Sequence, residues 1–91
     1  MKLAVVIPCY NVRDEILSLL SKIGQEVDAI YVVDDHCPQK TGELVEAKNR
    51  DRRVKVLFNP QNLGVGGATL RGYAEALKED AEILEIGRAH V

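Results

Sequence analysis

The 91-residue chain has no tryptophan, one phenylalanine and only two cysteines, Cys9 and Cys37. Two cysteines so far apart form neither a zinc-binding pattern nor a disulfide framework, so we expect free thiols and a cytoplasmic protein. The chain also lacks an apolar run near the roughly 18 residues that span a bilayer, which predicts no membrane segment here. The apolar stretch in the N-terminal MKLAVVIP is too short for a signal peptide.

A strong charge imbalance is missing as well. The net charge of -2 gives no reason to expect nucleic acid or an anionic membrane as a partner. No G-x-x-x-x-G-K-[ST] motif occurs, which excludes a P-loop. The turn after the first apolar run is PCYN, without glycine, and this disfavours a dinucleotide-binding domain. The length allows one small domain.

What the sequence does contain is an alternation of apolar runs and helical periodicity. Buried strands are predicted at 3–7, ended by Pro8, at 29–33 and 54–58, with a fourth beginning at 81–84. Helices are predicted at 12–23, 41–49 and 68–77, with Asn11 and Thr41 as caps of the first two. In the third helix, one apolar face is expected to hold Leu70, Tyr73, Ala74 and Leu77.

This order of elements predicts an α/β fold with a three-layer α/β/α arrangement around a parallel sheet. In such sheets, ligands bind beyond the carboxyl ends of the strands. Three polar segments follow predicted strands: PCYN, DDHCPQK and NPQNLGVGG. We therefore expect these segments to form one binding site.

The row Asp34, Asp35, His36 and Cys37 has the composition of a metal centre. However, the two aspartates end a predicted strand, and alternation along a strand sends their side chains to opposite faces of the sheet. They are therefore not expected to chelate one ion together. His36 is expected to be an exposed loop residue.

Three segments carry a family resemblance: VVIPCYN, YVVDD and FNPQNLGVGGATLRGYAEAL. In this order and at these spacings, they resemble the N-terminal half of family 2 glycosyltransferases with the GT-A fold. The resemblance implies the Rossmann-like, nucleotide-binding half of that fold. It also implies an inverting enzyme that transfers a sugar from a nucleoside diphosphate-sugar donor to an acceptor. The acceptor, a sugar or a lipid-linked molecule, is not identified by the sequence.

The resemblance also assigns roles to residues. Pro8 and Tyr10 would line the nucleotide base site, and Asp35 would accept a hydrogen bond from the base, with Asp34 close by. Packing against the first helix is the alternative role for Tyr10, and solvated loop carboxylates are the alternative for the two aspartates.

The third motif supplies the rest of the expected site. Gly66 and Gly67 would let the backbone approach the donor, next to a helix N-terminus that suits a diphosphate. Arg71 would supply positive charge to the donor, with a surface role as its alternative. The predicted nucleotide-sugar-binding set is therefore Pro8, Tyr10, Asp34, Asp35, Gly66, Gly67 and Arg71.

The sequence departs from the family pattern in its last residues. A complete enzyme of this type holds Mg²⁺ or Mn²⁺ with a D-x-D-like motif, but no D-x-D occurs here, so we expect no metal site, no catalytic base and no turnover from this chain alone. We interpret residues 1–84 as a truncated GT-A domain whose first strand keeps an unpaired apolar edge. The resemblance also allows C-terminal parts missing from this chain to associate the full protein with a membrane, as in the lipid-linked members of the family.

The final residues suggest a separate interpretation. Residues 85–91, EIGRAHV, resemble an in-frame translation of a sequencing-library adapter, which predicts a non-native tail. The alternative function for the chain is a non-catalytic, nucleotide-binding α/β module.

Overall fold

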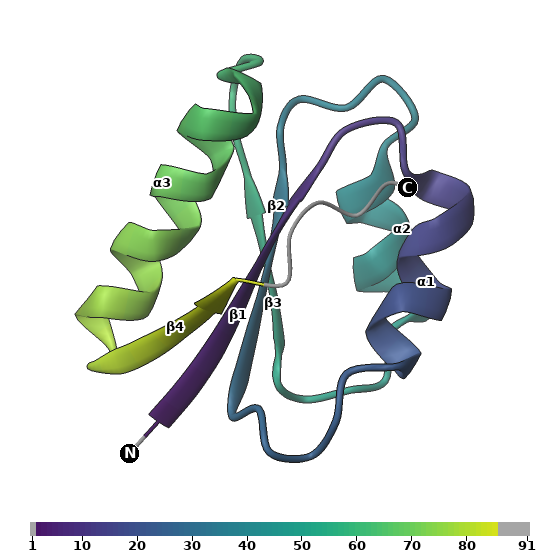
Figure 1. The fold of residues 1–91 in the computed structure, drawn as a ribbon. Helices are drawn as coiled ribbons and strands as arrows, with labels where there is room; N and C mark the ends of the chain where they lie inside the picture. Colours follow the sequence, from purple (N-terminus) through teal and green to yellow (C-terminus); the bar gives the residue numbers. More distant parts are fainter. Residues whose placement is uncertain (1, 86–91) are drawn as a thin grey trace.

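The computed structural model describes the backbone of residues 2–85 and the side chains of residues 2–83. Four parallel strands form one sheet in the order β3-β2-β1-β4, with α1 and α2 on one face and α3 on the other (Figure 1). The predicted three-layer α/β fold is confirmed, whereas most of the predicted 85–91 tail lies outside the described residues. The elements are β1 Lys2–Cys9, α1 Arg13–Ser21, β2 Ala29–Asp34, α2 Thr41–Lys48, β3 Val54–Phe58, α3 Gly64–Lys78 and β4 Ala81–Glu85.

The strand β1 lies inside the sheet and pairs along both sides. Its residue Val5 is paired with Ile30 of β2 and with Leu84 of β4. The prediction that the first strand keeps an unpaired edge was therefore wrong. The fourth strand, β4, does not lie beside β3 in the sheet. After α3 the chain returns to the opposite edge, where β4 pairs with β1.

The end of β1 also differs from the prediction, since the strand continues through Pro8 to Cys9. The carbonyl of Cys9 accepts a hydrogen bond from the Asp35 amide at 3.1 Å on the β2 side. Alternate residues of a strand direct their backbone groups to opposite neighbours, so the nitrogen of Pro8 faces the β4 side. The described β1–β4 pairing ends at Val6, and the ladder therefore requires no N–H from Pro8.

Alternation along the strands divides the interior into two apolar clusters, one on each face of the sheet. The cluster under α1 and α2 contains Val5, Ile7, Ile30, Val32, Ile16 and Val45 among its members. The cluster under α3 consists mostly of small residues around one tyrosine: Ala4, Val6, Ala29, Tyr31, Val33, Ala68, Ala76 and Ala81. Small side chains bring α3 close to the sheet.

The buried face of α3 is largely not the face that the sequence suggested. Ala68, Gly72 and Ala76 face the sheet, while Leu70 and Leu77 are each 66% exposed. Of the predicted face, Tyr73 packs against the cluster under α3. A Cβ atom on Gly72 would lie 2.2 Å from Cγ1 of Val6, which shows how closely the helix approaches β1. Where the helix comes this close to β1, only small residues fit, and the leucines point away from the sheet.

Both predicted side-chain caps were wrong. Asn11 adopts a left-handed backbone conformation at φ 57, and α1 begins two residues later without a side-chain cap of its own. The Arg13 amide instead donates to the side chain of Gln39 at 3.3 Å. Thr41 is the first residue of α2 and is fully buried, and the cap of this helix comes from a more distant residue.

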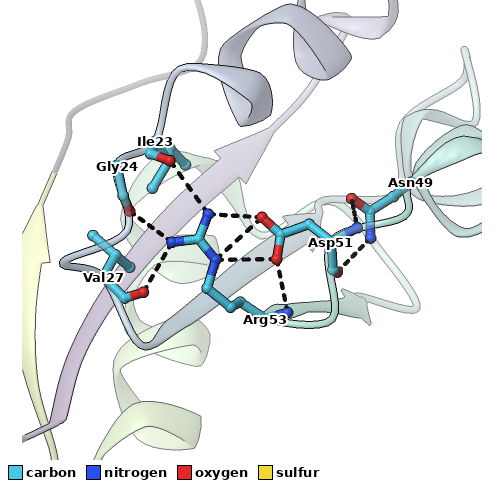
Figure 2. A network of polar contacts seen from close by, with 6 residues as sticks. All are labelled: Ile23, Gly24, Val27, Asn49, Asp51 and Arg53. Carbon is cyan, nitrogen blue, oxygen red and sulfur yellow. Dashed lines mark hydrogen bonds and ion pairs between the residues drawn. The ribbon is translucent and has the colours of Figure 1, made fainter.

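At the amino end of the sheet, Arg53 joins two loops (Figure 2). Its guanidinium donates to the carbonyl oxygens of Gly24 at 2.6 Å and Val27 at 2.9 Å, which precede β2. On its other side it forms an ion pair with Asp51 at 2.7 Å. The hydrogen bonds and charge of Arg53 hold the pKa of the Asp51 carboxyl below its usual range. This network fixes the end of the sheet opposite the polar segments.

A second ionic cluster lies under the C-terminal end of α3, where the carboxylate of Glu79 forms ion pairs with two lysines. Lys2 of β1 donates to Oε1 of Glu79 at 2.6 Å, and Lys55 of β3 donates to Oε2. The buried Tyr31 hydroxyl faces the same carboxylate, although no hydrogen bond of regular geometry joins the two groups. Hydrogen bonds from Lys2 and Lys55, together with the nearby Tyr31 hydroxyl, lower the pKa of Glu79 to about 2.

Protonation of Glu79 is therefore expected to destabilise the fold at acidic pH. Its pKa is depressed from 4.5 to about 2, so its contribution is complete above pH 4.5 and is lost as the pH falls toward 2. We expect Glu79→Gln to flatten the dependence of Tm on pH across this window, measured by thermal unfolding. Replacement of the exposed Glu46 by glutamine serves as the control and should leave the slope unchanged. Equal slopes for wild type and Glu79→Gln would contradict the prediction.

Candidate functional site

The ends of three strands are in register at one edge of the sheet. Cys9 of β1 is paired with Asp34 of β2, and Asp34 is paired with Phe58 of β3. The segments that follow these strands therefore start side by side, as the sequence predicts for a parallel sheet. The structure confirms that the three polar segments share this edge.

The side chain of Asp34 is directed toward α2, and both of its oxygens are occupied. Oδ1 accepts a hydrogen bond from the Cys37 amide at 2.8 Å, and Oδ2 accepts one from the Gly42 amide at 2.6 Å. The Gly42 amide is one of the first N–H groups of α2, which have no partner within the helix. Asp34 is thus the cap of α2, and it is only 3% exposed.

The side chain of Asp35 is directed to the opposite face of the sheet, as strand alternation predicts. Its Oδ1 accepts hydrogen bonds from Nδ2 of Asn59 at 2.9 Å and from the Leu63 amide at 2.8 Å. Its Oδ2 accepts no hydrogen bond from the described residues. It is not one of their fully buried polar atoms that lack a partner, so it is not enclosed by the protein. Two neighbouring aspartates therefore differ in one respect that matters for binding, because only Asp35 retains an oxygen for a ligand.

A small pocket of about 20 Å³ lies beside Asp35. Three sequence-predicted site residues, Pro8, Tyr10 and Asp35, line it, and Tyr10 is 44% exposed. Its complete lining is Pro8, Cys9, Tyr10, Asp35, Val65 and Ala68. The pocket thus combines an exposed aromatic ring, a rigid proline, an apolar helix face and a carboxylate.

The N-terminus of α3 borders this pocket, and some of its backbone donors have no partner among the described residues. Its first four amides, those of residues 63–66, lack partners within the helix. The Leu63 amide donates to Asp35, and the Gly64 amide donates to the side chain of Asn62 at 2.8 Å. The amides of Val65 and Gly66 have no partner among the described residues, and beyond its chain neighbours and the backbone of its own helix a Cβ built on Gly66 would meet nothing within 4 Å.

Gly67 differs from its neighbour because its surroundings are filled. A Cβ built on Gly67 would lie 2.6 Å from Cβ of Leu63, so its small size serves packing at the helix start. The helix starts four residues earlier than the sequence suggested, which places Gly66 and Gly67 in its first turn rather than in a loop before it.

The predicted cation Arg71 lies almost two turns into α3 and reaches back to the end of β3. Its Nη1 donates to the carbonyl of Phe58 and, at 2.8 Å, to Oδ1 of Asn59. All hydrogen bonds of Arg71 with the described residues use Nη1, so Nε and Nη2 stay available. Arg71 does not line the pocket beside Asp35.

Asn59 is the polar residue of this edge that the sequence analysis did not select. It is 3% exposed and lies between Asp35 and Arg71, to both of which it is hydrogen-bonded. Its position directly after a predicted strand, at the same edge as Asp35, was the available signal. An asparagine before a proline is common in turns, and for this reason it did not stand out.

The two cysteines are free and buried, and they differ in environment. Burial raises the pKa of the Cys9 thiol, and the negative charge of Asp34 adds to this effect. Burial also raises the pKa of Cys37, but hydrogen bonds from Thr41 and from backbone amides outweigh it and lower the pKa. One of these amides, that of Asn11, donates to Sγ at 3.2 Å, so Cys37 ties the end of β1 to the β2–α2 loop.

A metal centre does not form in the row of residues 34–37. Within residues 2–83, no three His, Cys, Asp or Glu side chains gather in a way that could hold an ion. Asp34 and Asp35 face opposite sides of the sheet, and His36 is exposed in a left-handed conformation at φ 59. Within the same part of the chain, no helix has the length and apolar character needed to cross a membrane.

Comparisons with known proteins point in one direction. The family model described as "Glycosyl transferase family 2" matches residues 4–81. Dolichol-phosphate mannosyltransferase from Pyrococcus furiosus is 31% identical over 94 positions, which cover 99% of this chain and 27% of that protein.

Solved structures of S. aureus TarS are similar as well. The structure in complex with UDP has a TM-score of 0.74 at 25% identity and is matched over 98% of this chain and 27% of its own. The complex with UDP-GlcNAc has a TM-score of 0.71 at 28% identity, over 98% and 26% of the two chains. The chain thus spans about a quarter of the length of these relatives.

Proposed function

The chain belongs to glycosyl transferase family 2, and we propose that it forms the nucleotide-binding part of an enzyme that moves a sugar from a nucleoside diphosphate-sugar to an acceptor. The observation that carries this proposal is the pocket beside Asp35, which we call the base pocket. In it, Asp35 retains one carboxylate oxygen beside Pro8 and Tyr10. The similar TarS structures in complex with UDP and UDP-GlcNAc support a donor of this class.

In this proposal the base pocket holds the edge of a nucleobase. The ring of Tyr10 offers an exposed aromatic surface, and Pro8 forms a rigid, apolar wall next to it. The free oxygen of Asp35 accepts a hydrogen bond from a ring N–H of the base. Asp34 contributes indirectly, because its two oxygens are engaged in holding the β2–α2 loop.

The diphosphate is proposed to lie at the N-terminus of α3. The unpaired amides of Val65 and Gly66 and the positive end of the helix dipole suit a phosphate group. The open space around Gly66 leaves room for close approach, whereas Gly67 supports the turn from inside. The unused Nε and Nη2 donors of Arg71 add positive charge near the same edge.

The chemistry of sugar transfer needs further groups. Members of this family generally use a divalent metal ion, but the described residues do not fit one, because their carboxylates do not gather. We therefore derive no catalytic step for this chain. The absence of turnover by this chain alone and a cytoplasmic location stay predictions.

Titration of the purified chain with UDP and GDP tests the proposal. We expect saturable binding, and we expect Tyr10→Ala to weaken it by about 5- to 100-fold, since stacking of a base on an aromatic ring contributes about 1–3 kcal/mol. Isothermal titration calorimetry measures both affinities.

Leu70→Ala is the matched control, because Leu70 is 66% exposed on the outer face of α3. It removes a similar amount of exposed apolar surface and should leave the affinity unchanged. The proposed function is wrong if the wild-type chain shows no saturable binding of either nucleotide.

A further inference from the structure

We propose that Asn59 is a positioning residue that decides which nucleobase the base pocket accepts. Together with the Leu63 amide, it fixes Asp35 so that a single hydrogen-bond acceptor, Oδ2, faces the ligand. This inference rests on the proposed function and goes beyond it, because it names the chemical class of the base and the residue that selects it.

The orientation of the Asn59 amide is set by its two neighbours. On one side, Nη1 of Arg71 is a donor only, and it lies 2.8 Å from Oδ1 of Asn59. On the other side, Oδ1 of Asp35 lies 2.9 Å from Nδ2 of Asn59. A guanidinium and a carboxylate leave one arrangement of the amide, with its oxygen toward Arg71 and its nitrogen toward Asp35.

The backbone of Asn59 is fixed as well. Its amide donates to the carbonyl of Asp34 at 2.9 Å, which continues the β2–β3 ladder by one bond. The residue is 3% exposed, so water does not compete strongly for its side-chain bonds. Asn59 therefore transmits the position of Arg71 on α3 to Asp35 at the end of β2.

The two carboxylate oxygens of Asp35 therefore have different roles. Oδ1 receives two donors, Nδ2 of Asn59 and the Leu63 amide, whereas Oδ2 has no partner among the described residues. Because the carboxylate is held at Oδ1, it does not turn freely to adapt to different ligands. The pocket therefore presents a fixed acceptor.

A fixed acceptor selects bases by the character of one ring nitrogen. Uracil and guanine carry a ring N–H beside a carbonyl and are donors at this point, whereas the corresponding nitrogen of cytosine is an acceptor. Two acceptors facing each other leave both unpaired. A hydrogen bond to a charged group contributes about 1.5–3 kcal/mol, so UDP and GDP should bind about 10- to 100-fold more tightly than CDP.

The variant Asp35→Asn reverses the character of the presented atom without changing its shape. The bonds from Asn59 and Leu63 require an acceptor at the Oδ1 position, so the new amide places its NH₂ group toward the ligand. We expect UDP to bind about 10- to 100-fold more weakly than to wild type, and CDP to bind at least as tightly as UDP. Calorimetric titration with UDP, GDP and CDP measures the ratios.

The variant Asn59→Leu tests the positioning role itself. It removes one of the two donors to Asp35 and leaves Arg71 with only the carbonyl of Phe58 as its acceptor, so the CDP-to-UDP ratio of dissociation constants should fall toward 1. Asn49→Leu is the matched control, because Asn49 also makes side-chain hydrogen bonds but lies before β3, at the other end of the sheet. This control should keep the wild-type ratio, and circular dichroism establishes that each variant is folded.

The outcomes separate the two proposals. A wild-type preference for UDP and GDP over CDP that disappears in Asn59→Leu and reverses in Asp35→Asn supports the inference. Wild-type selectivity that survives in Asn59→Leu, or persists in Asp35→Asn should Asn59→Leu fail to fold, overturns the inference and leaves the proposed function standing. If the wild-type chain binds none of the three nucleotides, both are overturned.

Discussion

Replacing Asp34 by alanine is expected to lower the free energy of unfolding by about 2–6 kcal/mol. The carboxylate is 3% exposed and accepts hydrogen bonds from the amides of Cys37 and Gly42. Alanine would leave both buried N–H groups without a partner, and each such group costs about 1–3 kcal/mol. Urea unfolding followed by circular dichroism measures the change, which should appear as a lower midpoint with an unchanged slope.

Asp14→Ala is the control for this prediction, because Asp14 is an exposed acidic residue in the first turn of α1. It tests the general effect of removing a carboxylate near a helix N-terminus, which is about 0.3–1 kcal/mol. If Asp34→Ala and Asp14→Ala destabilise the protein equally, Asp34 does not act as the cap of α2.

The second large effect is expected at Gly72. A Cβ atom at this position would lie 2.2 Å from Cγ1 of Val6 and 3.1 Å from its Cγ2, and Val6 belongs to the interior strand β1. Alanine normally stabilises a helix interior by about 1 kcal/mol relative to glycine. Here we expect Gly72→Ala to destabilise by about 1–3 kcal/mol and Gly72→Val by about 3 kcal/mol or more, because α3 must move away from the sheet.

Gly66→Ala provides the matched control on the same helix. A Cβ built on Gly66 meets no atom within 4 Å, so alanine should leave stability unchanged or raise it by up to about 1 kcal/mol. A double variant, Val6→Ala with Gly72→Ala, should lose less stability than the sum of its single changes, because each relieves the other. Strict additivity would show that the contact with Val6 is not the cause.

Asp34 and Asp35 show which properties of a site the sequence predicts and which it does not. The order of apolar runs placed both residues at the carboxyl end of β2, and alternation along the strand predicted that their side chains point to opposite faces of the sheet. Which of them retains a free oxygen depends on Gly42, Asn59 and Leu63, which are 8 to 28 positions away along the chain. Such partners are brought together by the sheet and have no local signal in the sequence.

Helix ends and helix faces were the least predictable features. Asn11 and Thr41 are residue types that favour N-caps, yet α1 and α2 are stabilised from the neighbouring loop and strand instead. In α3 the leucine pattern indicated an apolar face, but the sheet beneath it already carries Val6 and Tyr31. Only alanine and glycine fit between α3 and the Val6 side chain, so the available space, rather than hydrophobicity, decided which residues of α3 face β1.

The sequence by itself determined the alternation of strands and helices, the parallel sheet and the edge at which polar segments meet, because periodic apolar patterns act locally. The tertiary structure decided that β1 is covered on both sides, that α3 turns its small residues inward, and that Asp34 supports the fold while Asp35 faces a pocket. These features depend on hydrogen-bond partners and packing distances between residues far apart in the chain. Burial makes such contacts specific, since an unpaired polar group or an overlapping methyl group in the interior is costly.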